Sequence, residues 1–202
     1  KFVAEMLEHA AHTDFLTGVM NRRGMLQRLE AERHRLAHTG GFLAVMLVDV
    51  DHFKQINDTW GHALGDQALI AVASVLQNSV RDYDLVARWG GEEFVVALFG
   101  LTKFDELRVV ADKLLCAIRQ NGVECGETRL DLTYSIGAVM AAPQADLDAI
   151  VQRADEALYR AKAEGRDRAV LDCLKVDEPA CGQQQCCNED KPCPMAAKQA
   201  EF

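Results

Sequence analysis

The alternation of apolar and polar residues predicts helices and strands that follow one another along the chain. Residues 25–39 carry apolar side chains at positions 25, 26, 29 and 36, a helical spacing that Gly40-Gly41 ends. Residues 42–51 form an apolar run of strand length with acids only at its far end, which indicates a central strand buried on both faces. We also expect helices at residues 63–80, 105–119 and 146–163, and strands at residues 130–140 and 168–173.

The clearest local pattern is a hairpin centred on Gly90-Gly91. Two strand-like runs, LVARW before the glycines and EEFVVALFG after them, flank this turn. Strands joined by a tight turn pair antiparallel, and helices alternate with strands elsewhere in the chain. The sequence therefore predicts an α/β (α+β) fold with a mixed, mainly antiparallel central sheet flanked by helices, closed by an edge strand at residues 168–173.

The two ends of the chain differ from its body. Residues 1–13 contain no Gly or Pro and begin without Met, so we expect the end of an N-terminal signalling or linker helix in a fragment of a longer protein. Residues 14–172 are predicted to form one domain. Residues 173–202 lose the periodicity and are expected to be a flexible tail, whose role as a metal site, a redox element or a disordered segment stays open. The thiols concerned are Cys181, Cys186, Cys187 and Cys193.

Charge and cysteine placement narrow the classes of function. The chain has 22 Lys and Arg against 31 Asp and Glu, a net charge of −9, which argues against a generally basic surface for nucleic-acid polymers. The longest unbroken apolar run, Phe42 to Val48, is too short to cross a bilayer. Only two of the seven cysteines lie in the body, so we expect a cytoplasmic domain, which leaves open a membrane anchor elsewhere in the parent protein.

Acidic residues stand at the ends of predicted strands. Asp49 and Asp51 close the central strand, and Glu92 and Glu93 lie at the hairpin turn. If the hairpin lies beside the central strand, these carboxylates converge, and bound Mg²⁺ would relieve their mutual repulsion. Taken one at a time, each acid is better explained as a solvated turn residue.

The register of several motifs changes that interpretation. Gly90-Gly91-Glu92-Glu93-Phe94 resembles the signature of GGDEF domains, the diguanylate cyclases, in its GGEEF form. Further segments are similar to the family's other motifs, in the family's order, over about residues 13–170. They are DFLTGVMNRR at 14–23, DVDHFKQIND at 49–58, GHALGD at 61–66 and ADEALYRAKAEGRD at 154–167.

The resemblance implies a nucleotide-cyclase-like fold, with residues 14–172 as the catalytic domain, and a reaction. Two GTP condense to cyclic di-GMP and two pyrophosphates when each ribose 3′-hydroxyl attacks the α-phosphorus of the other GTP. A homodimer is then required for catalysis, and a sensor domain is expected before residue 1. The competing interpretation is an inactive cyclic di-GMP receptor, which the retained metal and phosphate residues disfavour.

The resemblance also assigns roles at the active site. Two Mg²⁺ ions, or Mn²⁺, would be held by Asp49, Glu92, Glu93 and the Val50 carbonyl, while Glu92 is also placed to accept the hydroxyl proton. Whether Glu92 is ligand or base stays open. The terminal phosphates would be held by Lys54, Lys162 and Arg166 and by the main-chain N–H groups near His52 and Phe53. The α-phosphate would approach the backbone of Gly90 and Gly91, and guanine would be bound by the side chains of Asn57 and Asp66.

Two of these roles rest on chemistry as well as resemblance. Lys162 and Arg166 stand four residues apart, a spacing that predicts one shared helix face, although a solvated basic helix end has the same pattern. Guanine presents N1–H and N2–H₂ donors that one carboxylate accepts together, and adenine presents no such pair. Asp66 therefore favours GTP over ATP.

A second constellation precedes the hairpin. Arg81 and Asp84 form an R-x-x-D whose five-residue offset from Gly90 resembles the family's inhibitory product site. Arginine donates two hydrogen bonds to guanine O6 and N7, and aspartate accepts from the N1/N2 edge. The family often adds an arginine from the next helix; Lys113 is the nearest equivalent here, with Arg108 as another candidate. The alternative is an ordinary surface pair.

Overall fold

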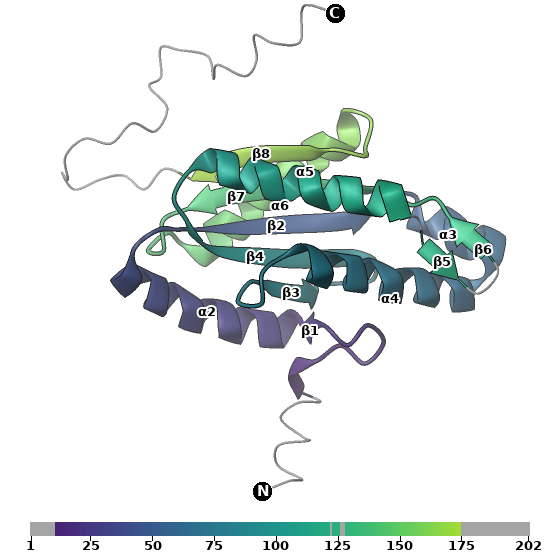
Figure 1. Cartoon of the computed structure of the whole chain (residues 1–202), viewed down its shortest axis with the longest axis horizontal. Helices are drawn as coiled ribbons and strands as arrows, with labels where there is room; N and C mark the ends of the chain where they lie inside the picture. The colour runs from purple at the N-terminus through teal and green to yellow at the C-terminus, as the bar shows by residue number, and fades with distance from the viewer. Residues whose placement is uncertain (1–10, 122, 126–127, 175–202) are drawn as a thin grey trace, which may run out of the picture.

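The computed structural model describes residues 11–121, 123–125 and 128–174 (Figure 1). Six strands form one sheet in the order β1-β3-β4-β2-β7-β8. Their bounds are β1 Met20–Asn21, β2 Phe42–Val50, β3 Leu85–Arg88, β4 Glu93–Leu101, β7 Tyr134–Ala141 and β8 Ala169–Leu174. A separate two-stranded sheet pairs β5 (Val123–Cys125) with β6 (Thr128–Leu130). The helices are α2 Arg22–Thr39, α3 Phe53–Trp60, α4 His62–Ser79, α5 Phe104–Asn121 and α6 Leu147–Ala163.

The central strand β2 organises the sheet. It pairs antiparallel with β4 on one side and with β7 on the other along almost its whole length. Eight of its nine residues are buried, as the unbroken apolar run predicted. The outer pairs β1–β3 and β7–β8 are parallel and the other three are antiparallel, which confirms the mixed, mainly antiparallel sheet.

Helices cover both faces of the sheet, and the two-residue period of β2 divides its side chains between them. Ala44, Met46 and Val48 pack in one core with buried residues of α4 and α5. Leu43, Val45 and Leu47 pack in the other core with residues of α2 and α6. The odd-numbered side chains of β2 therefore point toward α6, which fixes the direction of Asp49 at the end of the strand.

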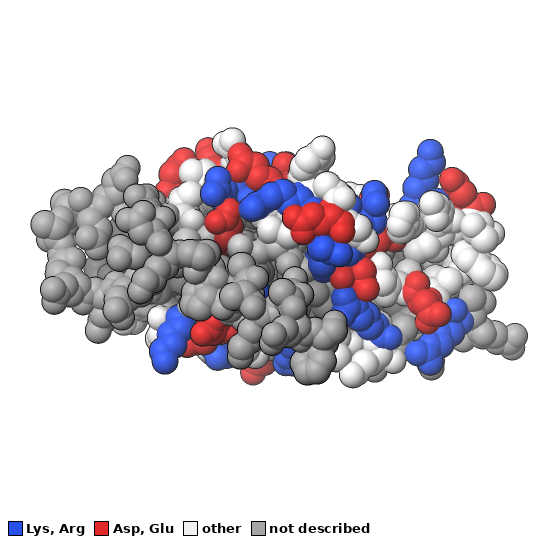
Figure 2. Space-filling view, turned by 90° about the horizontal axis from the view of Figure 1, so that it is seen from above, with Lys and Arg blue, Asp and Glu red and all other residues white. Residues whose placement is uncertain are grey.

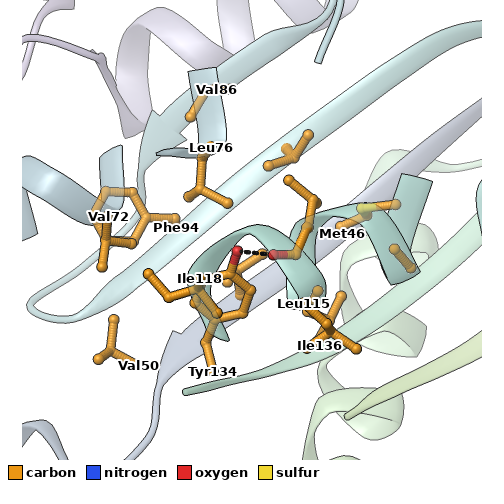
Figure 3. Packing of buried hydrophobic residues seen from close by; sticks show 14 of the residues in the cluster. Met46, Val50, Val72, Leu76, Val86, Phe94, Leu115, Ile118, Tyr134 and Ile136 are labelled. Carbon is orange, nitrogen blue, oxygen red and sulfur yellow. Dashed lines mark hydrogen bonds between the residues drawn. The ribbon is translucent and has the colours of Figure 1, made fainter. Parts of the chain in front are cut away.

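The α4 and α5 core is closed near the loop end of β7 by a buried tyrosine (Figure 3). Tyr134 is fully buried, and its hydroxyl donates a hydrogen bond of 2.6 Å to the Leu114 carbonyl of α5. Burial raises the pKa of the Tyr134 phenol, so the hydroxyl stays protonated at neutral pH. This bond ties α5 to the start of β7.

The structure departs from the sequence predictions in several places, one of which is the unpredicted two-residue strand β1. Helix α3 was not predicted, because it spans only eight residues, FKQINDTW, and begins without a side-chain cap. The β5–β6 pair was also missed, and the strand expected at residues 130–140 begins only at Tyr134, since Leu130 belongs to β6. The edge strand expected at residues 168–173 is confirmed as β8.

Predictions for the two ends fall largely outside the described residues. Of the helix expected at residues 1–13, only Ala11 and His12 are described as helical. The four tail cysteines after residue 174 also lie outside. No helix in the described part of the chain is long and apolar enough to cross a membrane. Figure 2 shows basic and acidic side chains interspersed on the face seen from above, without a broad area of one sign among the residues described there.

Gly137 of β7 tests the packing of α6 on the sheet. A Cβ at this position would collide with the Ala154 carbonyl oxygen and the Leu158 backbone nitrogen of α6. We expect Gly137→Ala to lower the free energy of unfolding by about 1–3 kcal/mol, since backbone cannot move aside as a side chain can. Urea unfolding followed by circular dichroism measures this. Gly91→Ala is the matched control, because its Cβ would meet nothing within 4 Å; equal stability of the two variants would contradict the packing described.

Candidate functional site

Two carboxylates meet where β2 ends and β4 begins. The register of the two strands places Asp49 directly opposite Glu93. The hairpin turn continues the pairing, because the Val50 N–H donates to the Glu92 carbonyl at 3.3 Å and the Trp89 N–H donates to the Glu93 carbonyl at 2.8 Å. The hairpin therefore does lie beside the central strand, and it brings these two acids to one end of the sheet.

A lysine from α6 reaches the same carboxylates. Lys162 Nζ lies 2.8 Å from Asp49 Oδ2, and the Asp49 side chain is largely buried. Burial raises the pKa of Glu93, and the negative charge of Asp49 raises it further, while Lys162 acts in the opposite direction. Glu92 and Asp155 add smaller unfavourable charges. The site thus holds an excess of negative charge that a single ammonium group offsets only in part.

The donor set suits a hard divalent cation. Asp49 and Glu93 offer carboxylate oxygens, and the Val50 carbonyl lies in the same segment. Within the described residues, no three His, Cys, Asp or Glu side chains gather closely enough to hold a metal by themselves. Mg²⁺ takes one or two carboxylates and completes its octahedron with water and substrate phosphates, so two carboxylates fit this ion.

The turn after β2 has a strained backbone that exposes a helix N-terminus. His52 precedes α3 with φ 57°, a left-handed conformation that is costly for a residue with a Cβ. Its side chain does not cap the helix, so the first N–H groups of α3, near Phe53 and Lys54, keep no side-chain partner there. Such an N-terminus, beside the exposed side chain of Lys54, suits a phosphate group.

The loop after α6 lies against this turn. Asp51, the residue before His52, accepts a hydrogen bond of 3.1 Å from the Asp167 N–H, which brings Arg166 next to the start of α3. The prediction that Lys162 and Arg166 share a helix face is wrong: α6 ends at Ala163, and Arg166 follows in a left-handed conformation with φ 62°. A hydrogen bond, rather than helical spacing, therefore brings Arg166 to the end of the sheet.

Asn57 and Asp66 are brought together by the packing of α3 on α4. A Cβ on Gly65 would collide with the amide oxygen of Asn57 and touch the Phe53 ring, so only glycine permits this approach. Asp66, the next residue, is exposed on the first turns of α4. The two residues thus stand on the same helix pair, Asn57 half-buried and Asp66 open to solvent.

The hairpin turn is held from outside by an arginine that sequence reasoning missed. Arg88 donates to the Gly91 carbonyl from Nε at 3.0 Å and from Nη2 at 2.8 Å. Its Nη1 lies 3.3 Å from Asp14 Oδ1. Burial alone would raise the pKa of Asp14, but two hydrogen bonds from Thr17 and the Arg88 charge outweigh it and lower the pKa. The segment Asp14–Gly18 is thereby tied to the Gly-Gly turn.

The R-x-x-D segment is ordered by its own contacts. Asp84 accepts from the Arg81 N–H at 3.1 Å and from the Phe99 N–H at 3.2 Å, while its burial raises the pKa of the carboxyl. The Arg81 guanidinium donates to the Tyr83 hydroxyl at 2.6 Å. A groove of about 620 Å³ runs beside Arg81 and Asp84, lined also by residues between 12 and 28.

The two predicted helix partners of this segment differ. Lys113 Nζ donates to the Ser79 carbonyl at 2.7 Å, which satisfies the last turn of α4. Arg108 Nε is buried and has no hydrogen-bond partner among the described residues. Of the two side chains, Arg108 is therefore the one with an N–H group still available to a ligand.

Comparisons with known proteins agree with this arrangement. Residues 11–168 match the family described as "Diguanylate cyclase, GGDEF domain". Diguanylate cyclase DgcP of Pseudomonas aeruginosa is 42% identical over 158 residues, covering 78% of this chain and 23% of the relative. Diguanylate cyclase DgcM of Escherichia coli is 38% identical over 170 residues, covering 84% and 40%. The chain thus spans well under half the length of these relatives.

Solved structures show the same fold. The coiled coil and GGDEF domain of DgcB from Caulobacter crescentus, in complex with c-di-GMP, is 30% identical with a TM-score of 0.73, covering 83% of this chain and 89% of that one. Diguanylate cyclase SiaD of Pseudomonas aeruginosa, in complex with its activator SiaC, is 37% identical with a TM-score of 0.73, covering 85% and 64%.

Glu93 offers a test of the charge at the site without any substrate. Its raised pKa means that ionised Glu93 costs folding free energy above that pKa, and that the cost vanishes when the group is protonated. In metal-free buffer, Glu93→Gln should therefore stabilise the protein at pH 7 by up to about 1 kcal/mol after solvent screening. The gain should shrink as the pH falls through the raised pKa of Glu93, and it should be absent below about 4, where the carboxyl is protonated in the folded and the unfolded protein alike. Chemical unfolding at both pH values measures it, and destabilisation at pH 7 would contradict the excess of negative charge.

Proposed function

The chain belongs to the GGDEF family of diguanylate cyclases, and from this premise we propose that it condenses two GTP molecules to cyclic di-GMP and releases two pyrophosphates. The observation that carries the proposal is the meeting of Asp49, Glu93 and Lys162 at the end of β2. Carboxylates that can hold a divalent cation, beside a lysine that can bind phosphate, suit phosphoryl transfer, in which the negative charge of the phosphates must be neutralised.

The substrate's phosphates would be held by groups around the turn that follows β2. The N–H groups at the start of α3 and the side chains of Lys54 and Arg166 take the terminal phosphates. Lys162 contacts Asp49 in this structure, and it would bind the phosphates if that carboxylate held a divalent cation instead. Gly90 and Gly91 have no side chains, so the α-phosphate can approach the backbone of the turn.

Asp49, Glu93 and the Val50 carbonyl would hold Mg²⁺. This ion supplies charge neutralisation at the α-phosphate and at the leaving pyrophosphate. Glu92 does not form a three-carboxylate group with Asp49 and Glu93. We therefore assign to Glu92 the role of general base, which accepts the proton of the attacking 3′-hydroxyl. The resemblance alone left the role of Glu92 open between ligand and base.

Asn57 and Asp66 would select guanine. The Asp66 carboxylate accepts from N1–H and N2–H₂ together, and adenine leaves that acceptor without a partner. One protomer binds one GTP and the product contains two, so two copies must face each other across a two-fold axis. The homodimer is therefore part of the proposed active state.

We assign product feedback to Arg81 and Asp84, with Arg108 rather than Lys113 as the arm from α5. The ordered Asp84 carboxylate and the exposed Arg81 side chain support guanine recognition there. The Lys113 ammonium is already bound to the end of α4, whereas the Arg108 Nε has no hydrogen-bond partner in the part of the chain that the structure describes.

Asp49→Asn tests the proposed chemistry. The variant keeps the size of the side chain and removes the charge that would bind the cation, so turnover of GTP in the presence of Mg²⁺ should fall by far more than tenfold. Pyrophosphate release measures the rate, and circular dichroism checks the fold. Retention of more than about a tenth of the wild-type rate, a loss below roughly 1.4 kcal/mol, would sink the assignment of Asp49 as a metal ligand.

Arg81→Ala separates feedback from catalysis. Four residues of β3 separate the R-x-x-D from the hairpin turn, so the variant should leave the initial rate almost untouched. Loss of a bidentate guanine contact, on the order of 1–3 kcal/mol, should weaken inhibition by added cyclic di-GMP at least several-fold. Progress curves with and without added product compare the two proteins. If added cyclic di-GMP slowed wild type and variant equally, Arg81 would have no role in product inhibition.

A further inference from the structure

The loop after α6 is held in a conformation that its sequence does not favour. Gly165, Arg166 and Asp167 have φ values of 115°, 62° and 47°, three left-handed residues in succession. This conformation is unfavourable for a residue with a Cβ, and such residues persist where their surroundings fix them. The contacts of this loop with the rest of the protein must therefore fix the position of the Arg166 backbone, and with it the direction in which the side chain leaves the loop.

On one side the loop is anchored to a buried aspartate. Asp51 is only 5% exposed, and its carboxylate accepts from Thr133 Oγ1 at 2.8 Å and from Ser135 Oγ at 2.7 Å. A third bond comes from the Asp167 N–H. This network fixes the position of one backbone group in the loop, but it leaves the peptide that follows Asp167 without a hold.

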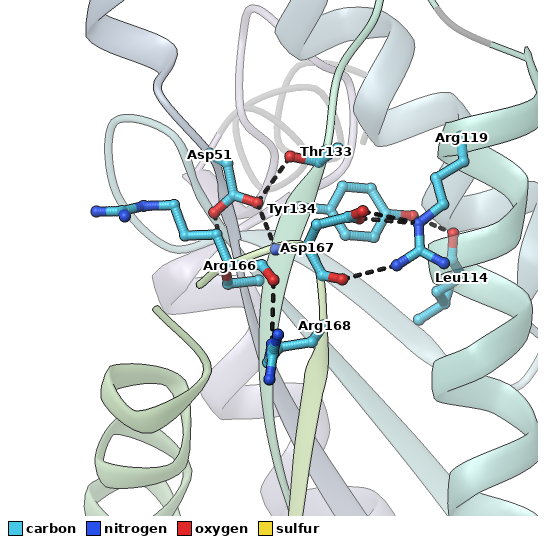
Figure 4. A network of polar contacts seen from close by, with 9 residues as sticks. Asp51, Leu114, Arg119, Thr133, Tyr134, Arg166, Asp167 and Arg168 are labelled. Atoms are coloured by element: carbon cyan, nitrogen blue, oxygen red, sulfur yellow. Dashed lines mark hydrogen bonds and ion pairs between the residues drawn. The ribbon is translucent and has the colours of Figure 1, made fainter. Parts of the chain in front are cut away.

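On the other side the loop is held by hydrogen bonds from Arg119 of α5 (Figure 4). Arg119 Nε donates to both carboxylate oxygens of Asp167, at 2.9 and 3.1 Å. Its Nη2 donates to the Asp167 carbonyl oxygen at 2.6 Å. The planar guanidinium thus binds the side chain and the main chain of one residue through separate nitrogens, a fork that the single nitrogen of an ammonium group does not offer.

The Arg166 side chain leaves the loop on the side away from Arg119, as Figure 4 shows. It is exposed, and no hydrogen bond or ion pair of its guanidinium is found within the described part of the chain. We propose that Arg119 is a positioning residue, which sets the direction of Arg166 toward the terminal phosphates of GTP. This inference rests on the proposed function.

A purely structural role for Arg119 makes a different prediction. The Arg119–Asp167 pair is about half exposed, with side-chain exposures of 47% and 38%, so its contribution to stability is small. Breaking it should hardly move the unfolding transition. If the pair positions Arg166, the loss appears in nucleotide binding, and only for nucleotides that carry terminal phosphates.

The test compares the binding of two nucleotides to four proteins by titration calorimetry in the presence of Mg²⁺. The ligands are a non-hydrolysable GTP analogue and GMP, which keeps the base and one phosphate. The proteins are wild type, Arg119→Ala, Arg119→Lys and Arg153→Ala. Arg153 is the matched control, because its Nε pairs with Asp172 at 2.8 Å and its side chain is also 47% exposed.

We expect Arg119→Ala to raise the dissociation constant of the GTP analogue about three- to tenfold, the partial loss of one charge-assisted hydrogen bond, with that of GMP unchanged. Arg119→Lys should fall between this variant and wild type, and Arg153→Ala should match wild type. Equal binding of the analogue by wild type and Arg119→Ala would overturn the proposal, as would an equal loss for both nucleotides. A wild type that binds the analogue no better than GMP would instead refute the proposed phosphate site itself.

Discussion

The antiparallel pairing of β2 with β4 sets Asp49 against Glu93 at the end of a strand that is buried along both faces. Eight apolar or buried positions in β2 fix this register, because a slip by one residue would turn each side chain to the opposite face. The alternation that sends Leu43, Val45 and Leu47 toward α6 also sends Asp49 toward Lys162. The charge at the site is thus a consequence of how the apolar core is packed.

Around these carboxylates, hydrogen bonds rather than apolar contacts hold the two segments that carry Glu92 and Arg166. Arg88 holds the Gly91 carbonyl and reaches Asp14, so the turn that bears Glu92 is supported from a segment more than seventy residues away. Asp51 holds the loop that carries Arg166. These hydrogen bonds fix the backbone that carries the half-buried Glu92 and the exposed Arg166, whose flexible side chains packing alone would leave free to move.

Much of the fold and the family could be predicted, because both depend on patterns of residues close together in the sequence. The apolar run of β2, the glycine pair of the hairpin and the spacing of the long helices each determine an element, and the order of the motifs determined the family. Helix α3 was not predicted because it is only eight residues long and begins without a side-chain cap. The shared helix face of Lys162 and Arg166 failed because Gly165 ends the helical path between them. The roles of Arg88 and Arg119 were missed because the acidic partner of each lies 74 or 48 residues away in the sequence, and no periodicity indicates such pairs.

The central claim is that the acids at the end of β2 serve the condensation of two GTP molecules. The most direct measurement is to incubate the protein at high concentration, so that two copies meet, with Mg²⁺ and either GTP or ATP, and to identify the products by mass. Cyclic di-GMP from GTP, with two pyrophosphates released for each product and no dinucleotide from ATP, is the expected result. Unchanged GTP, or equal conversion of ATP, would contradict the claim.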